Sequence, residues 1–296
     1  MKLGLALGGG GARGAAHIGF LMALRELGVW PDLITGTSAG AIIGALVAAG
    51  MDLAAIAAFW TEINLPQLFS LPGSKPAFTD NVKAEALIES AIGRPTFADL
   101  KIPLAVVAVD LVHRQEVVLD EGDVISAVLA SAAYPILAPP VQRNGMLLID
   151  GGVLNNVPFD VARARGATYV LAIDLSNTAP YGTVVEPSTS APGLLGKALT
   201  ATQRRPIWQV ASAVSDILTT QGVRARMAIS PPDLLVRPNV GTLGLFDFHR
   251  TGEGVDAGKK AAQNASETLQ KLVAKVTAHD KLQQTENKLP GERSNA

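Results

Sequence analysis

The chain has 296 residues, of which 48% are hydrophobic and 17% are charged, and its formal net charge is −1. This length is enough for one large α/β core. The balanced charge excludes the broad basic surface that nucleic-acid binding requires, so no nucleic-acid partner is expected. The chain has no cysteine, which excludes disulfides and thiolate metal sites and fits the cytoplasm, where we expect the protein.

The first residues, MKLGLALGGGGARG, lack the long apolar core and cleavage site of a signal peptide. They predict a strand over residues 2–7, a glycine loop, and a helix from about Ala12 to Leu27. A second strand is expected over residues 33–35, followed by a helix over residues 39–49.

Residues 37–60 contain no lysine or arginine and only one acidic residue, Asp52. The stretch is long enough for a membrane span. Gly50 and Asp52 interrupt it, however, so we predict a buried helix followed by a second, shorter one.

Later segments alternate between strand and helix patterns, which indicates an α/β fold, specifically a three-layer α/β/α sandwich with a mainly parallel central sheet. We expect a single domain over residues 1–278, and a polar, disordered tail over residues 279–296. A flexible loop is expected over residues 177–192. The expected strands cover residues 103–111, 115–119, 146–150, 169–175 and 234–238, and the expected helices cover residues 80–92, 123–131, 158–165, 207–226 and 250–278.

A serine, Ser38, lies where the second strand is expected to become a helix. Gly36 and Gly40 flank it in a G-x-S-x-G pattern, which is typical of a nucleophilic serine on a sharp turn. A glycine-rich turn used only for close packing would give the same five residues.

The glycine loop GGGGARG, residues 8–14, has two interpretations. Gly9, Gly11 and Gly14 match a dinucleotide-binding fingerprint, but the acidic residue expected after the second strand is missing. Alternatively, the loop amides at a helix N-terminus form an anion cradle beside Ser38, suited to an oxyanion. Arg13 would then either support the loop or meet a phosphate, and we favour support.

A nucleophilic serine needs a base. His249 follows Asp150 in the chain, so Ser38, Asp150 and His249 would have the order of an α/β-hydrolase triad. The alternative base is Asp150 itself, which ends the apolar run LLID before two glycines. Burial would raise the proton affinity of this carboxylate.

The blocks GGGGARG, GTSAG, ASAAYP and DGG, in this order, resemble the patatin-like phospholipases, and in particular short bacterial members of the neuropathy-target-esterase type. The resemblance covers roughly residues 2–175. It implies a Ser–Asp dyad of Ser38 and Asp150 without metal or organic cofactor. It also implies an oxyanion hole at Gly9, Gly10, Gly11 and Arg13, and a site shaped by Gly36, Gly40, Ser131, Pro135, Gly151 and Gly152.

We therefore predict a serine hydrolase acting on lipid esters, such as a phospholipase, lysophospholipase or esterase. The alternatives are a lipid- or acyl-binding regulatory module with little turnover and, more remotely, a nucleotide-dependent oxidoreductase. The sequence does not specify the head group, the acyl chain or the oligomeric state.

Peripheral contact with the inner membrane surface is also predicted. The expected contact is the apolar loop at residues 65–71, with Leu68 and Phe69 at its tip, helped by LGLF at residues 243–246. Alternatively, these side chains pack on the core.

Overall fold

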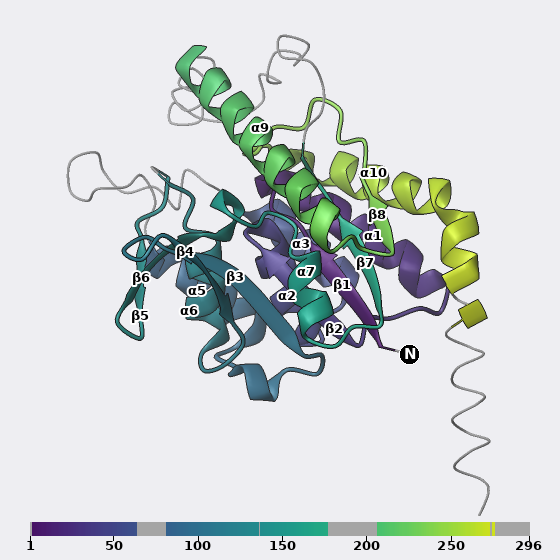
Figure 1. The fold of residues 1–296 in the computed structure, drawn as a ribbon, viewed down its shortest axis with the longest axis horizontal. Coiled ribbons are helices and arrows are strands. Elements are labelled where there is room, and N and C mark those ends of the chain that lie inside the picture. Colours follow the sequence, from purple (N-terminus) through teal and green to yellow (C-terminus); the bar gives the residue numbers. More distant parts are fainter. Residues whose placement is uncertain (1, 64–80, 136, 177–205, 273, 276–296) are drawn as a thin grey trace, which may run out of the picture.

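A computed structural model describes residues 2–63, 81–135, 137–176, 206–272 and 274–275 (Figure 1). Its strands are β1 (Leu3–Leu7), β2 (Leu33–Thr37), β3 (Leu104–Asp110), β4 (Gln115–Leu119), β5 (Val141–Arg143), β6 (Met146–Asp150), β7 (Tyr169–Ile173) and β8 (Leu234–Val236). Its α-helices are α1 (Ala15–Glu26), α2 (Ala39–Ala48), α3 (Leu53–Glu62), α5 (Asn81–Ile92), α6 (Val124–Ser131), α7 (Phe159–Ala164), α9 (Pro206–Ile229) and α10 (Thr251–Asn264). The expected order of strands and helices is confirmed, whereas the loop at 177–192 and the tail at 279–296 lie outside the described residues.

Local chemistry explains several boundaries. The stretch that is long enough for a membrane span forms two helices, α2 and α3, because Gly50 takes a φ of 88° and Asp52 caps α3 by accepting a hydrogen bond from the Ala54 amide. In the described part of the chain, no helix combines the length and apolar character needed to cross a membrane. The β5–β6 hairpin turns through Asn144 and Gly145, both with positive φ, as a tight two-residue turn requires.

Two helix boundaries differ from those expected. The first helix begins with a 3-10 turn over Gly11–Gly14, so that α1 proper starts at Ala15. The last expected helix, to residue 278, instead ends at Asn264, and a further helical segment begins at residue 266.

The sheet has eight strands among the described residues, ordered β5-β6-β3-β2-β1-β7-β8, with β4 also paired to β3. The pairs β1–β2, β2–β3, β1–β7 and β7–β8 are parallel, which confirms a mainly parallel centre, and antiparallel strands lie at one side. The strands of the parallel centre are almost fully buried, because helices cover both faces.

The central strand β3 has two edges, and one of them is shared by two strands. Strand β4 pairs with residues 106–110 and overlaps in register with both β2 and β6, so it must occupy the opposite edge from them. On the shared edge, β2 ends with Thr37 opposite Val107, and the antiparallel β6 ends with Asp150 opposite Ala108. The C-terminal ends of β2 and β6 therefore meet head to head on adjacent residues of β3.

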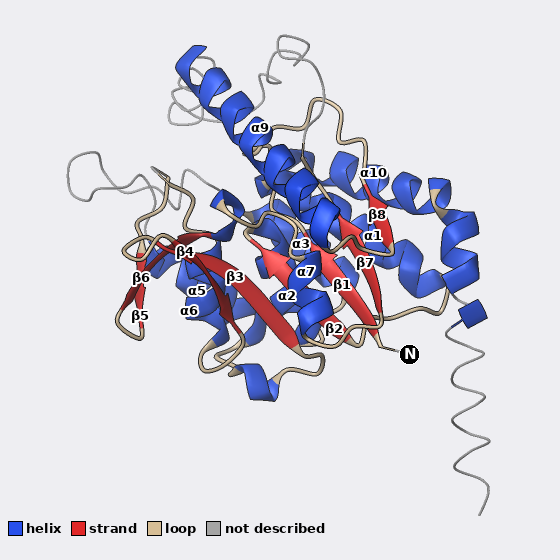
Figure 2. Cartoon of the chain, in the orientation of Figure 1, coloured by secondary structure: helices blue, strands red, loops and turns tan. Residues whose placement is uncertain are grey.

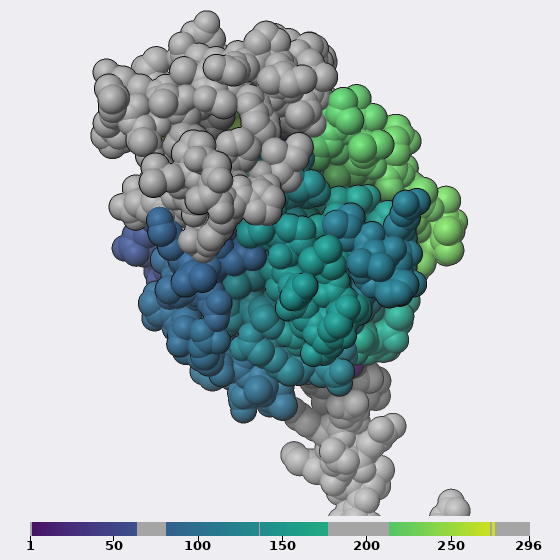
Figure 3. All heavy atoms as spheres, turned by 90° about the vertical axis from the view of Figure 1, so that its left-hand side faces the viewer, coloured from purple at the N-terminus to yellow at the C-terminus, as the bar shows by residue number. Residues whose placement is uncertain are grey.

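Helices cover both faces of the sheet (Figures 1 and 2). On one face, α1, α2, α3, α6 and α10 contribute to a core that includes Leu5 and Leu7 of β1. On the other face, Ala6 of β1 packs with Phe159 of α7 and Val223 of α9. The alternation along β1 shows the period of two that a strand buried on both faces requires. Figure 3 turns the molecule by 90°, and the described atoms facing the viewer come mainly from the blue and teal middle of the chain, with α9 in green along one edge.

Helix α10 packs closely on α1 through glycines. A Cβ on Gly258 would lie 2.0 Å from the Ala16 carbonyl oxygen, and a Cβ on Gly19 would lie 1.9 Å from the Val255 carbonyl oxygen. Both contacts are with backbone atoms, which cannot give way as a flexible side chain would. The two helices are thus held at a spacing that only glycine permits.

We expect Gly258→Ala to lower the free energy of unfolding by about 1–3 kcal/mol, the usual cost of overpacking a core. The added methyl group would force α10 away from Ala16. Gly252 is a matched control, because it lies in the same helix and a methyl group added to it would meet nothing within 4 Å, so Gly252→Ala should leave stability unchanged or raise it. Urea denaturation of the two variants measures the difference, and equal stabilities would contradict the packing account.

Candidate active site

Ser38 lies at the turn between β2 and α2, in a strained backbone conformation with φ 54° and ψ −121°. Such a conformation costs on the order of 1–3 kcal/mol and must be held by its surroundings. The Ser38 amide donates a 2.9 Å hydrogen bond to Ser131 Oγ, which in turn donates to the Val107 carbonyl oxygen at 2.6 Å. Ser131 therefore fixes the strained turn to β3, and the Ser38 side chain remains partly exposed.

The two flanking glycines permit the close approach of α2. A Cβ on Gly40 would lie 2.1 Å from the Leu7 carbonyl oxygen, and a Cβ on Gly36 would lie 2.6 Å from the Gly40 carbonyl oxygen. Larger residues at these positions would push α2 away from the ends of β1 and β2. The G-x-S-x-G pattern therefore places Ser38 beside the glycine loop that follows β1.

Asp150 ends β6 and reaches the same point from the opposite direction. Its amide donates to the Ala133 carbonyl oxygen at 3.0 Å, and its Oδ1 accepts a 2.7 Å hydrogen bond from the Gly152 amide. A Cβ on Gly151 would lie 2.2 Å from the Val107 carbonyl oxygen, so only glycine lets the turn pack on β3.

Burial raises the pKa of Asp150 from 3.8 to about 6, and the Ser38 side chain and the Gly152 amide offset part of that rise. Oδ2 of Asp150 is buried, and no described residue gives it a well-formed hydrogen bond. The Ser38 side chain is close enough to the carboxyl to lower its pKa, but it does not meet the geometric criteria of a hydrogen bond to Oδ2. A buried carboxylate oxygen with an unused lone pair beside a hydroxyl can accept the proton of that hydroxyl.

The glycine loop is only partly free to hold an anion. The Gly8 amide donates to the Ile173 carbonyl oxygen, and the Gly9 amide donates to the Asn156 carbonyl oxygen, each at 3.0 Å. Among the described residues, the amides of Gly10 and Gly11 donate no hydrogen bond to the protein. A Cβ on Gly9 would lie 3.0 Å from Ser38 Cβ, so Gly9 serves the site by close approach rather than as a free donor.

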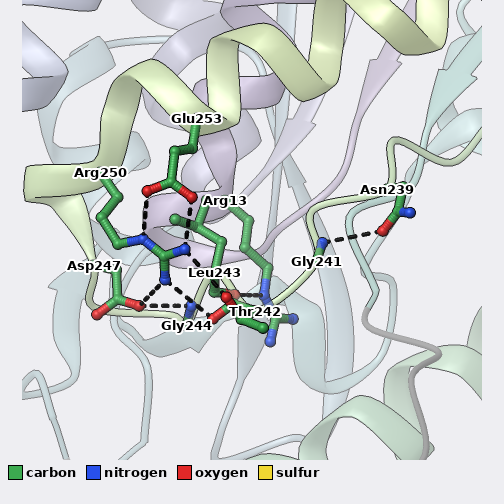
Figure 4. Close-up of polar contacts among 9 residues, drawn as sticks. All are labelled: Arg13, Asn239, Gly241, Thr242, Leu243, Gly244, Asp247, Arg250 and Glu253. Atoms are coloured by element: carbon green, nitrogen blue, oxygen red, sulfur yellow. Dashed lines mark hydrogen bonds and ion pairs between the residues drawn. The ribbon is translucent and has the colours of Figure 1, made fainter. Parts of the chain in front are cut away.

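Arg13 supports the loop from behind. Its side chain is buried, with Nε donating to the Leu243 carbonyl oxygen at 2.9 Å and Nη1 forming a 3.1 Å ion pair with Asp216 (Figure 4 draws the Leu243 contact). The Arg13 amide donates within the loop, to the Gly10 carbonyl oxygen at 3.2 Å. The hydrogen bond to Leu243 and the ion pair with Asp216 fit a supporting role for the Arg13 side chain rather than direct contact with an anion.

The two asparagines that follow DGG have roles that no sequence pattern predicted. The Asn155 carbonyl oxygen accepts from Thr37 Oγ1 at 2.8 Å, at the residue before Ser38. The Asn156 side chain lies between Gly9 and Gly152, because a Cβ on either glycine would come within 3 Å of its Oδ1. The strand end at Asp150 predicted a turn here, but only the structure shows that the turn touches the glycine loop.

The histidines occupy other positions. His17 is fully buried and its Nε2 contacts the Gly8 carbonyl oxygen at 2.7 Å, while burial lowers its pKa to about 4. His113 contacts Asp110 at 2.5 Å at the far end of β3. His249 is exposed on the 3-10 turn Phe248–Arg250.

The family model for patatin-like phospholipases matches residues 5–163, which is more than half of the chain. The chain belongs to the patatin-like phospholipase family. An uncharacterized NTE family protein of Mycobacterium tuberculosis is 32% identical over 92% of this chain and 48% of its own length. The neuropathy target esterase sws of Drosophila melanogaster is 33% identical over 60% of this chain and 13% of its own length. A lysophospholipase of Yarrowia lipolytica is 32% identical over 59% of this chain and 13% of its own length.

The chain therefore spans about half the length, or less, of these curated relatives. Among solved structures, VipD from Legionella pneumophila superposes with a TM-score of 0.55 at 15% identity, covering 89% of this chain and 67% of that one, which supports the patatin-like α/β fold alone. The matched region includes Ser38 and Asp150 but ends before α9 and α10.

In this patatin-like chain, the block ASAAYP contacts the backbone of both Ser38 and Asp150. Ser131 Oγ accepts from the Ser38 amide, and the Ala133 carbonyl oxygen accepts from the Asp150 amide. Pro135 lies half-buried, two residues beyond Ala133. The block thus accepts one hydrogen bond from the backbone amide of each residue, through the Ser131 hydroxyl and the Ala133 carbonyl oxygen.

Proposed function

We propose that this protein is a lipid ester hydrolase in which Ser38 is the nucleophile and Asp150 is the general base. The observation that carries the proposal is the meeting of β2 and β6 on one edge of β3, which brings a strained serine against a buried carboxyl with a raised pKa. Family membership and the names of the related esterase and lysophospholipase support an ester of a lipid as the substrate class.

In the proposed reaction, Asp150 accepts the Ser38 proton as Oγ bonds to the acyl carbon. The carbonyl electron pair moves to oxygen, and the free amides of Gly10 and Gly11 stabilise that negative charge. The tetrahedral intermediate then expels the alcohol, which takes the proton from Asp150. Asp150 next removes a proton from water, whose oxygen attacks the acyl carbon. The second tetrahedral intermediate expels Ser38, which takes that proton back from Asp150, and the fatty acid is released.

Contact with a lipid surface stays a prediction. Leu68 and Phe69 lie outside the described residues. In the second proposed segment, Leu243 is only 2% exposed and its carbonyl oxygen is bound by Arg13, so the assignment of Leu243 to lipid contact is wrong. The packing alternative holds for this residue because Leu243 belongs to the support of the glycine loop. We propose a cytoplasmic location with peripheral membrane contact through the 65–71 loop.

A fluorophosphonate probe should label Ser38 and no other serine. The reason is that attack on tetrahedral phosphorus needs both an activated hydroxyl and amides for the phosphoryl oxygen. Mass spectrometry of the labelled peptide checks the position, and a hydrolysis panel of phospholipids, lysophospholipids, triacylglycerols and p-nitrophenyl esters identifies the substrate class. Folded protein that resists the probe and hydrolyses none of these esters would favour a lipid-binding module instead.

A further inference from the structure

The glycine loop rests on a segment that lies beyond the family-matched residues 5–163. The Ala12 amide donates to the Leu245 carbonyl oxygen at 2.8 Å, and Arg13 Nε donates to the Leu243 carbonyl oxygen at 2.9 Å. Gly11 has a φ of 55°, and a Cβ there would lie 2.2 Å from the Leu245 oxygen. The turn at residues 242–247, here called the bracing turn, is thus in direct contact with the loop that carries the free amides.

The bracing turn has its own internal support, drawn in Figure 4. The Gly244 amide donates to Asp247 Oδ2 at 2.9 Å. Arg250 Nη1 donates to the Thr242 carbonyl oxygen at 3.3 Å, and Nη2 donates to Thr242 Oγ1 at 3.1 Å. Because the same guanidinium also contacts Asp247 at 3.4 Å, Arg250 ties the two ends of the turn together.

Arg250 is itself anchored to α10. Its Nε and Nη2 donate to the two carboxylate oxygens of Glu253, at 2.8 and 2.6 Å, in the bidentate geometry that favours arginine over lysine. Helix α10 packs in close backbone contact with α1 at Gly258, and α1 continues directly from the glycine loop. The contacts therefore form a closed circuit from the loop through α1, α10, Arg250 and the bracing turn back to the loop.

We propose that Arg250 is a positioning residue, which acts through the bracing turn to hold the amides of Gly10 and Gly11 where an oxyanion forms. The inference rests on the proposed function of the Ser38 site. Among the described residues, Arg250 forms no hydrogen bond or ion pair with Ser38, Asp150 or the glycine loop, and its effect passes through the carbonyl oxygens of Leu243 and Leu245.

The proposal predicts a larger effect on rate than on stability. Removing one oxyanion donor costs about a hundredfold to a thousandfold in rate, and a misplacement of about 1 Å costs a similar factor. The ion pair with Glu253, whose side chain is 62% exposed, should contribute little to folding. A positioning role therefore predicts a loss of rate with little loss of stability, whereas a merely structural role predicts a loss of stability.

We expect Arg250→Ala to lower kcat about tenfold, with KM nearly unchanged and Tm close to that of the unmodified protein. The matched control is Arg94→Ala. Arg94 also contacts two carboxylates, those of Glu85 and Glu89, but it lies after α5 and outside the circuit. Arg94→Ala should keep the full kcat. Glu253→Gln, which only weakens the anchor, should lower kcat about threefold and covers the case in which Arg250→Ala does not fold.

The second readout is the fluorophosphonate reaction, because the phosphoryl oxygen of the probe needs the same amides. In Arg250→Ala, the labelling rate constant should fall by the same factor as kcat, while the final stoichiometry stays at one probe per chain. Unchanged kcat and labelling rate in Arg250→Ala or Glu253→Gln would overturn the proposal, as would a lower stoichiometry with an unchanged rate. Unmodified protein that is neither labelled nor active would refute the proposed function, and this inference with it.

Discussion

Ser38→Ala should reduce ester hydrolysis at least about a thousandfold, because the reaction loses the oxygen that bonds to the acyl carbon. The fold should survive the change. The hydrogen bond that holds the turn comes from the Ser38 amide rather than from its side chain, and alanine meets the same backbone strain as serine at a φ of 54°. Initial rates on the most reactive ester of the panel, with circular dichroism as the check on folding, measure the loss.

Ser90→Ala provides a matched control for this variant. Ser90 is an exposed serine on α5, and among the described residues its hydroxyl donates only to the Leu87 carbonyl oxygen of the same helix. The Ser90→Ala variant should hydrolyse the ester as fast as the unmodified protein. Folded Ser38→Ala protein that keeps a tenth or more of the activity would rule out Ser38 as the nucleophile.

Asp150→Asn should lower kcat by about a hundredfold to ten-thousandfold while making the protein more stable at neutral pH. Asparagine can still accept from the Gly152 amide through its oxygen, but it cannot take the Ser38 proton. Since burial raises the pKa of Asp150 from 3.8 to about 6, its proton stabilises the folded state at low pH, and this stabilisation is lost as the pH rises through 6. The variant avoids burying that charge, so its free energy of unfolding at pH 7.5 should be higher by about 3 kcal/mol.

Urea denaturation at pH 7.5 and at pH 4 tests the sign, because the advantage of Asp150→Asn should disappear at the lower pH. The same pKa predicts that kcat/KM of the unmodified protein rises with pH and levels off above about 6.

The Ser38→Ala, Asp150→Asn double variant should be no slower than either single variant, since the two groups work as a unit. His249→Ala should keep most of the activity, and a folded His249→Ala protein as inactive as Ser38→Ala would point to the triad instead.

Much of the fold could be predicted because its signals are local. The near-continuous apolar run at residues 103–111 indicated a buried parallel strand, and β3 occupies Leu104–Asp110. Asn144 and Gly145 indicated the hairpin by their preference for positive φ. The 37–60 stretch was correctly assigned to two helices because Gly50 and Asp52 are a helix stop and a helix cap.

The proximity of Ser38 and Asp150 could not be derived from local pattern. It depends on β2 and β6 sharing one edge of β3, which is a matter of sheet order and register. The position of Asp150 at a strand end suggested it as a base for Ser38, but did not show that the two residues meet. The occupied Gly9 amide could not be foreseen either, since its partner Asn156 is far away in the chain. A run of glycines predicts a loop with available amides but does not say which of them the fold already uses.

The assignment of Leu243 to lipid contact is wrong for the same reason. An apolar segment in the less clearly matched part of the chain suggested contact with lipid, because the burial of Leu243 and the use of its carbonyl oxygen by Arg13 leave no trace in the local sequence. Hydrophobicity alone does not distinguish a side chain that packs inside from one that faces a membrane.

The hydrogen bond between Arg13 and Leu243 joins residues 230 positions apart, and it has a consequence for biosynthesis. During translation, the segment that carries Ser38 and Asp150 leaves the ribosome well before residues 243–245, and contacts between distant residues form late in folding. The nascent chain can therefore hold Ser38 for some time without the final support of the glycine loop. The contacts that support the glycine loop are complete only after the bracing turn has been synthesised, and a ribosome-bound fragment that ends before it would lack that support.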